Sequence, residues 1–149
     1  MSNRKYEFKV EGIVPPRNVR RKSKSMWNNQ TEVRRLIELR KEAYATLNGA
    51  SPLSGDIALS IKIHLPRNYN NPGDLDNYIK GICDGLSTIK SADNPNYGIH
   101  PDFKEPNHKN IHPETFAIIE DDGEIIKITA TKAVEDIEKP FYEVVIEGE

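Results

Sequence analysis

The sequence has a single cysteine, no long hydrophobic run, and no internal repeat or low-complexity linker. One cysteine excludes an internal disulfide framework and suits a reducing compartment, so we expect a cytoplasmic protein in which Cys83 is a small buried side chain. No segment approaches the roughly 20 apolar residues that span a bilayer. The first residues lack the apolar stretch of a secretory signal, so no membrane partner is expected. With 149 residues the chain is expected to form one domain around one core.

Charge is close to balanced overall but unevenly distributed. The chain carries −2, yet residues 1–50 hold twelve Lys and Arg against five Asp and Glu, a charge of +7. Residues 51–149 hold nine against eighteen, a charge of −9. Such a split predicts a basic surface for a polyanion and an acidic region elsewhere. Solvated surfaces that happen to sort along the chain would give the same numbers, so charge alone leaves both interpretations open.

Hydrophobic periodicity predicts the order strand, helix, strand, helix, strand, strand. This order is typical of an α/β (α+β) domain in which helices pack on a mixed β-sheet. Residues 90–113 contain four prolines and little periodicity, so we expect a long loop insertion in the single domain 1–149. The expected elements cover residues 6–13, 30–48, 57–65, 75–89, 116–130 (with a turn at 120–124 that favours a hairpin) and 142–146.

The first predicted helix has signals at both ends. Asn29, with Glu32 three residues later, resembles a capping box, and Gly49 is a typical stop. Its buried stripe is expected to consist of Val33, Leu36, Ile37, Tyr44 and Leu47. Its solvated face is expected to carry Arg34, Arg35, Arg40 and Lys41.

Two aspartates mark the start of the second predicted helix. Asp74 and Asp76 project from the helix entrance, where the positive end of the helix dipole keeps carboxylates ionised. Ionised carboxylates suit Mg²⁺, which prefers hard oxygen ligands and completes its octahedron with waters and substrate phosphate. Asp is also among the commonest N-cap residues, so a structural role stays open. Lys80, one turn after Asp76, is placed to neutralise a phosphate beside the metal, and Asp84 continues the stripe.

A second acidic cluster is formed by Glu120-Asp121-Asp122-Gly123-Glu124. Asp-Gly between apolar runs is a strong turn signal, which favours a structural role. Four acidic residues in five also repel one another unless something cationic sits there. A metal that joined this turn to the helix entrance would relieve the repulsion. The sequence alone does not decide whether the two clusters meet.

These segments together resemble one family. Asp74-Leu75-Asp76-Asn77, then Lys80, then Asp84-Gly85-Leu86 is similar to the signature of RusA-type Holliday junction resolvases. Asp121-Asp122, followed by Ile125-Ile126, resembles the second acidic motif of that family, and Pro15-Pro16-Arg17-Asn18 resembles its N-terminal Pro-Pro segment. The final strand, Tyr142 to Ile146, also corresponds. The resemblance covers most of the chain in the right order.

The resemblance implies a homodimeric endodeoxyribonuclease that resolves four-way DNA junctions by paired symmetric nicks, with Mg²⁺ as cofactor and Mn²⁺ as a substitute. Asp74, Asp76 and Asp122 match its metal-binding catalytic carboxylates, and Lys80 matches its functional lysine. Asp121 is a further candidate ligand. The implied metal activates a water and offsets charge growing on the phosphate. The family has a short connection where this chain has residues 90–113, which leaves its preference among branched DNAs open.

A basic run precedes the first helix. It contains no acidic residue and is predicted to contact DNA phosphates through Arg17, Arg20, Arg21, Lys22 and Lys24. Trp27 is expected in the core rather than stacked on a base. Three histidines of the insertion, His100, His108 and His112, match no compact zinc motif, so zinc is not expected.

Two other functions stay open. The same scaffold could bind DNA without cutting it, its acidic residues serving as caps and a turn. It could instead cut flaps or other branched DNA, with the insertion setting the choice of substrate.

Overall fold

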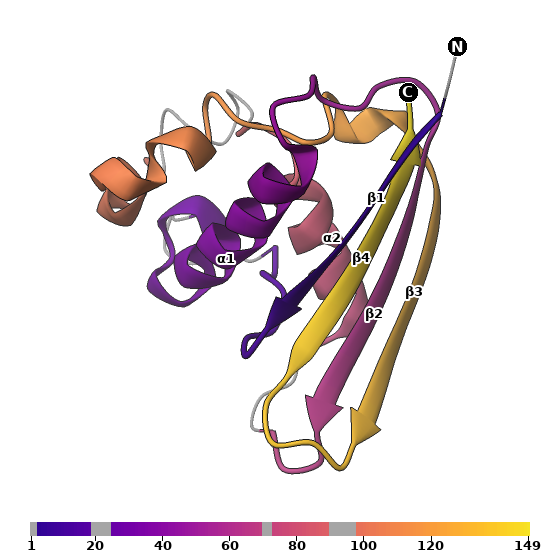
Figure 1. Ribbon diagram of the computed structural model, residues 1–149. Helices are drawn as coiled ribbons and strands as arrows, with labels where there is room; N and C mark the ends of the chain where they lie inside the picture. Colours follow the sequence, from indigo (N-terminus) through magenta and orange to yellow (C-terminus); the bar gives the residue numbers. More distant parts are fainter. Residues whose placement is uncertain (1–2, 19–24, 70–72, 90–97) are drawn as a thin grey trace.

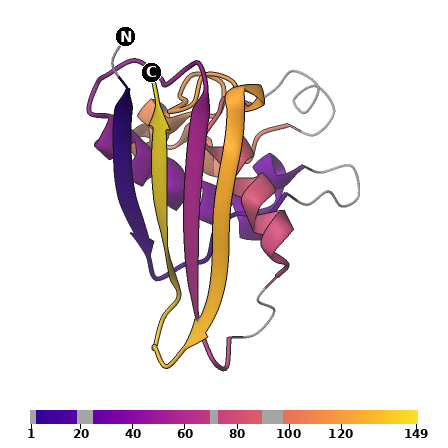
Figure 2. The same ribbon diagram turned by 90° about the vertical axis from the view of Figure 1, so that its right-hand side faces the viewer.

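A computed structural model of the protein describes residues 3–18, 25–69, 73–89 and 98–149. Four strands form one mixed sheet, and the helices among these residues all lie on one face of it (Figure 1). Figure 2 looks onto the other, bare face. This confirms the predicted single-domain α+β architecture. The elements, with η for 3-10 helices, are β1 (Arg4–Glu11), η1 (Met26–Asn28), α1 (Gln30–Leu47), β2 (Ile57–Pro66), α2 (Leu75–Gly85), η2 (Pro101–Lys104), η3 (Pro106–Ile111), η4 (Asp122–Glu124), β3 (Ile125–Glu135) and β4 (Phe141–Gly148).

The sheet has the strand order β1-β4-β2-β3. β4 pairs antiparallel with both β1 and β2, whereas β2 and β3 run parallel. The parallel pair needs a crossover, which α2 and the segment after it provide. Strict alternation of apolar residues in β2 and β4 turns one side of each strand into the core, as predicted from period two. The inward side chains are Ile57, Leu59, Ile61, Ile63 and Leu65 of β2 and Tyr142, Val144 and Ile146 of β4.

α1 follows the predicted boundaries closely. The Asn29 side chain accepts hydrogen bonds from the backbone amides of Thr31 and Glu32, and Asn48 ends the helix in the left-handed conformation at φ 50°. The Glu32 side chain is not the return arm of a capping box, because it binds two arginines instead. Tyr44, predicted in the buried stripe, is 42% exposed and packs edge-on against Phe116.

The prediction that Arg40 lies on the solvent-exposed face of α1 is wrong. Its side chain is fully buried, and its guanidinium lies 5.3 Å from the ring centroid of Trp27. Burial lowers the pKa of Arg40 to about 9, so the group stays charged at neutral pH. A buried charge is tolerated only when its donors are satisfied. Five backbone carbonyls do this, those of Gly85, Ser87, Ile111, His112 and Phe116, at 2.5 to 2.9 Å.

The predicted long loop is ordered over residues 98–113, whereas residues 90–97 lie outside the described part. Phe103 is fully buried in η2, with its ring centroid 6.1 Å from that of Trp27. Trp27 is itself buried, as expected. The His100 ring accepts from the Asp102 amide, and the His112 ring accepts from the amide two residues further on. These imidazoles therefore serve as local caps, and the segment is a folded cover over α1.

The segment before β3 differs from the prediction. Residues 116–119 form no strand and make only an isolated bridge, between Leu53 and Ile119. Asp121-Asp122-Gly123 is consequently not a hairpin turn but the entry into η4, from which β3 starts at Ile125. Of the helices in the described ranges, none is long and apolar enough to cross a membrane.

Candidate functional site

α2 starts at Asp74, whose carboxylate does not cap the helix. Asp74 has extended backbone at φ −83° and ψ 145°, the conformation of an N-cap, but its side chain makes no capping hydrogen bond. Asp76 follows in the first turn, and both aspartates are exposed. Capping was the structural role that competed with metal binding for Asp74. The Asp74 side chain does not cap the helix.

The same side of α2 continues through Lys80 and Asp84, one and two turns after Asp76. Lys80 is exposed and Asp84 is half-buried. The opposite side of the helix packs into the core through Tyr78 and Ile82, both fully buried. The predicted stripe of Asp76, Lys80 and Asp84 therefore lies on the accessible side of the helix. We call these three residues the α2 polar stripe.

The segment Pro15–Asn18 crosses α2 closely, and a glycine makes this possible. A Cβ added at Gly81 would lie 1.9 Å from the Pro16 carbonyl oxygen, closer than any side chain allows. The crossing brings the backbone amide of Asn18 to the carbonyl of Asn77 at 3.3 Å. It also brings Asn18 Nδ2 within 2.6 Å of Asp84 Oδ2. One end of the polar stripe is thus bound by a residue from the N-terminal Pro-Pro segment.

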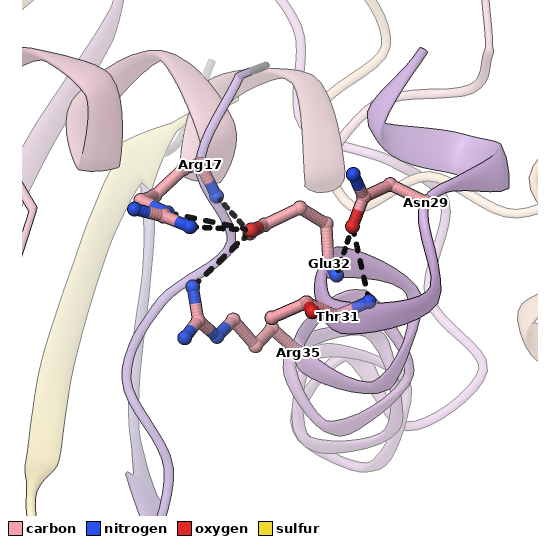
Figure 3. A network of polar contacts seen from close by, with 5 residues as sticks. All are labelled: Arg17, Asn29, Thr31, Glu32 and Arg35. Atoms are coloured by element: carbon pink, nitrogen blue, oxygen red, sulfur yellow. Dashed lines mark hydrogen bonds and ion pairs between the residues drawn. The ribbon is translucent and has the colours of Figure 1, made fainter. Parts of the chain in front are cut away.

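A buried glutamate anchors this crossing segment. Glu32 accepts from the Arg17 backbone amide at 2.7 Å and forms ion pairs with the guanidinium groups of Arg17 and Arg35 at 3.2 and 3.3 Å (Figure 3). Only 1% of the Glu32 side chain is exposed, against 25% for Arg17. Arg17, predicted to contact DNA, thus shares the single negative charge of Glu32 with Arg35 within the protein. The other predicted DNA-contacting residues, Arg20, Arg21, Lys22 and Lys24, lie outside the described residues.

The second acidic cluster separates into distinct roles. Asp121 caps η4, because its Oδ1 accepts from the Gly123 amide at 2.9 Å. The Glu124 carboxylate accepts from the amide of Gly55, which ties the turn to the start of β2. Asp122 is half-buried and takes neither of these roles. The cap on η4 thus comes from Asp121 and not from Asp122.

Asp122 is brought to the far end of α2 by the chain before it. The amides of Ile118 and Ile119 both donate to the Leu86 carbonyl, at 2.9 and 3.1 Å. Asp122 also lies close enough to Cys83, on α2, to affect the pKa of its thiol. Burial raises the pKa of the Cys83 thiol to about 12, and the carboxylates of Asp84 and Asp122 raise it further. The thiol is therefore neutral at physiological pH, in keeping with an inert, half-buried side chain.

Two segments that are distant from each other in the sequence thus lie beside α2. They are Pro15–Asn18 and the Asp121–Asp122 turn. The structure does not, however, gather Asp74, Asp76 and Asp122 around one point. In the described ranges no three His, Cys, Asp or Glu side chains are arranged to hold a metal ion. At 1.5 Å rise per residue, Asp74 and Asp84 are about 15 Å apart along the helix, and Asp122 lies towards the Asp84 end.

The donor chemistry at the helix entrance nevertheless fits Mg²⁺. This ion retains several waters and is commonly held by one or two carboxylates plus substrate phosphates. Asp74, with its uncapped carboxylate, and Asp76 meet that requirement. Asp122 would have to complete the set from the other end of the polar stripe.

A scan against models of protein families and a search of curated proteins found no match for this chain.

Two residues of this site were not assigned a role from the sequence. Asn18 was noticed only as part of the Pro-Pro segment, and its bond to Asp84 depends on the glycine at 81 that lets the chains approach. Asp84 was placed on the stripe but not among the site residues. Its spacing of four from Lys80 was the available signal. No local pattern connects it to Asp122.

Proposed function

We propose that the protein is a cytoplasmic, Mg²⁺-dependent endodeoxyribonuclease that acts as a homodimer and resolves four-way DNA junctions by paired symmetric nicks. One observation carries this proposal. The three sequence segments that resemble the RusA-type resolvases, which span residues 15 to 122, come together beside α2. An accidental match of short motifs gives no reason for them to be neighbours in space.

The residues would divide the chemistry among them. Asp74 and Asp76 would hold Mg²⁺, or Mn²⁺ in its place. Asp122 would join them as a third ligand only on closure of the gap along α2 that separates Asp74 from the Asp84 end in this structure. The bound ion supplies a Lewis acid and a nucleophile at neutral pH. Lys80 lies exposed on the same side of α2 and would neutralise charge that develops on the scissile phosphate. The Asn18 amide would bind the carboxylate of Asp84 at the other end of the polar stripe.

Backbone contacts with DNA would come from the basic run Arg20, Arg21, Lys22 and Lys24. Arg17 would instead position that run, since Glu32 holds it. A two-fold dimer presents the same site twice, which matches the near two-fold symmetry of a four-way junction. Two coordinated nicks then follow from the symmetry of the complex.

The test is cleavage of an end-labelled four-way junction, a duplex and a flap of the same sequences, with Mg²⁺ and with EDTA. We expect Mg²⁺-dependent symmetric nicks in the junction alone. Asp76→Asn should abolish cleavage and leave junction binding intact or tighter, because the fold and the basic run remain. Glu7→Gln is the matched control, since it makes the same carboxylate-to-amide change on an exposed residue of the bare sheet face.

The same assay separates the other candidates. An active Asp76→Asn protein would exclude the metal assignment. Junction binding without cleavage in any metal would identify a DNA-binding protein, and cleavage of flaps in preference to junctions would identify a different structure-specific nuclease. Asp122→Asn should remove cleavage, whereas Asp121→Asn should leave it largely intact, because asparagine keeps the side-chain oxygen that caps η4. The reverse result would assign the ligand to Asp121.

A further inference from the structure

Among the described residues, β3 is a sheet edge with no strand on its outer side. It pairs with β2 on one side only, and it is the longest strand, with 11 residues. Three of the four large hydrophobic residues exposed in the described ranges belong to it: Ile126 at 67%, Ile128 at 42% and Val134 at 51%. Soluble proteins usually shorten, charge or cover such edges, because they pair readily with another strand. The exposed apolar side chains on this edge therefore indicate that another strand pairs with it.

The register with β2 assigns each side chain of β3 to a face of the sheet. Leu59 and Leu65 point into the core, so their partners Ile128 and Val134 lie on the side that carries the helices. Lys127 and Glu135 have the opposite phase and lie on the bare side. An apolar pair thus occupies one face of the edge, and an oppositely charged pair occupies the other.

We propose that β3 pairs antiparallel with β3 of a second copy of this chain, with the two-fold axis at Thr131. In this register Lys127 lies opposite the partner's Glu135, and Ile128 lies opposite the partner's Val134. Symmetry repeats both pairs, so four complementary contacts form on two faces. Within one copy, Glu135 already contacts His64 of β2, with Nδ1 2.7 Å from Oε2.

Neighbouring registers lack this complementarity. An axis at Ala130 sets Lys127 against the partner's Ala133 and leaves Glu135 opposite the partner's Ile125. An axis at Lys132 sets two lysines directly against each other, which is destabilising. Charge therefore selects one register out of those that the exposed apolar residues would allow.

The paired edges would join two four-stranded sheets into one of eight strands. Because the axis is perpendicular to the sheet, the helices of both copies lie on the same face. α2 is the helix beside β3 (Figure 2). Lys132 Nζ of β3 donates to the Gly73 carbonyl at the entrance of α2, at 3.0 Å. The two α2 polar stripes would then flank the axis on one side of the dimer. This last consequence rests on the proposed function, whereas the pairing itself does not.

The test is the molecular mass of the purified chain by sedimentation equilibrium, without DNA or metal, so that a failure here is separate from a failure of cleavage. We expect a dimer. Lys127→Glu and Glu135→Lys should each raise the dimer dissociation constant by about tenfold or more, since each places like charges opposite twice. The double variant should return it to within about threefold of the original value.

Lys5→Glu on β1, the opposite edge of the sheet, is the control and should leave the dissociation constant unchanged. Circular dichroism of every variant checks that the monomer is folded. A monomeric parent protein would overturn the proposal. So would a dimer that is unaffected by Lys127→Glu, or single variants whose charge reversal is not rescued in the double variant.

Discussion

Replacing Arg40 by methionine should remove the contact that holds residues 98–119 against α1. The guanidinium donates to five carbonyls, of Gly85, Ser87, Ile111, His112 and Phe116, and its side chain is fully buried. A buried acceptor that loses its donor costs about 1–3 kcal/mol. The five costs do not add, because the segment can relax and admit water. Removing one partner from a buried charged network costs about 3–5 kcal/mol, which we expect for Arg40→Met.

The assay is urea unfolding followed by fluorescence. The chain has a single tryptophan, Trp27, and the Arg40 guanidinium lies beside its ring, so the signal reports on this region. For a chain of this size a loss of 3–5 kcal/mol corresponds to a melting temperature lower by roughly 6–20 °C. Arg40→Lys should fall between the two proteins, because an ammonium has three donors in place of five.

Arg34→Met is the control on the same helix, since Arg34 is exposed, and it should change the free energy of unfolding by less than about 0.5 kcal/mol. A loss of under about 1 kcal/mol for Arg40→Met would refute the reasoning, because an average point substitution costs about that much. Hydrogen exchange gives an independent readout. The amides of residues 101–116 should exchange faster in Arg40→Met while those of β2 and β4 keep their relative protection.

Three further substitutions test other contacts. Gly81→Ala places a Cβ 1.9 Å from the Pro16 carbonyl oxygen, so urea unfolding should show a loss of more than about 2 kcal/mol; an unchanged midpoint would contradict the close crossing. Tyr142→Phe removes a buried hydroxyl that has no hydrogen-bond partner among the described residues, so stability at pH 7 should stay equal or rise by up to about 1 kcal/mol. Burial raises the pKa of Tyr142 above 10.0, so the unfolded chain ionises first and folding is weakened as pH rises past that value. Between pH 7 and 11 the free energy of unfolding should therefore decrease less for the Phe variant than for the parent protein. An equal decrease in the two proteins would exclude this effect. Glu32→Gln leaves Arg17 and Arg35 without their counter-charge and should cost about 3–5 kcal/mol in a thermal melt; a fully stable variant would show that the pair is dispensable.

Elements with a strong local pattern were predictable from the sequence. β2 and β4 alternate without interruption, and α1 has an Asn cap, an apolar stripe and a left-handed end. Such signals act within a few residues, so no knowledge of the rest of the chain is needed. The entrance of α2 belongs to the same class, because the positions of Asp74, Asp76 and Lys80 follow from the helix start alone.

Features that depend on distant partners were not predictable. A charged residue at position 40 is expected in water unless carbonyls from residues 85–116 are known to surround it. The same reasoning applies to residues 98–113, whose order comes from Arg40 and Trp27 and not from a period of their own. The separation of Asp122 from the entrance of α2 is likewise set by contacts of Ile118 and Ile119 with Leu86.

The strand that is made last lies in the middle of the sheet. β4 separates β1 from β2, so β1 has no paired strand, and β2 has only β3, until residues 141–148 exist. On the ribosome the emerging chain must therefore keep β1 unpaired while more than a hundred further residues are added. Contacts between the two ends of a chain also slow folding. Chaperones that shield extended apolar segments would consequently have a long interval in which to act on this protein.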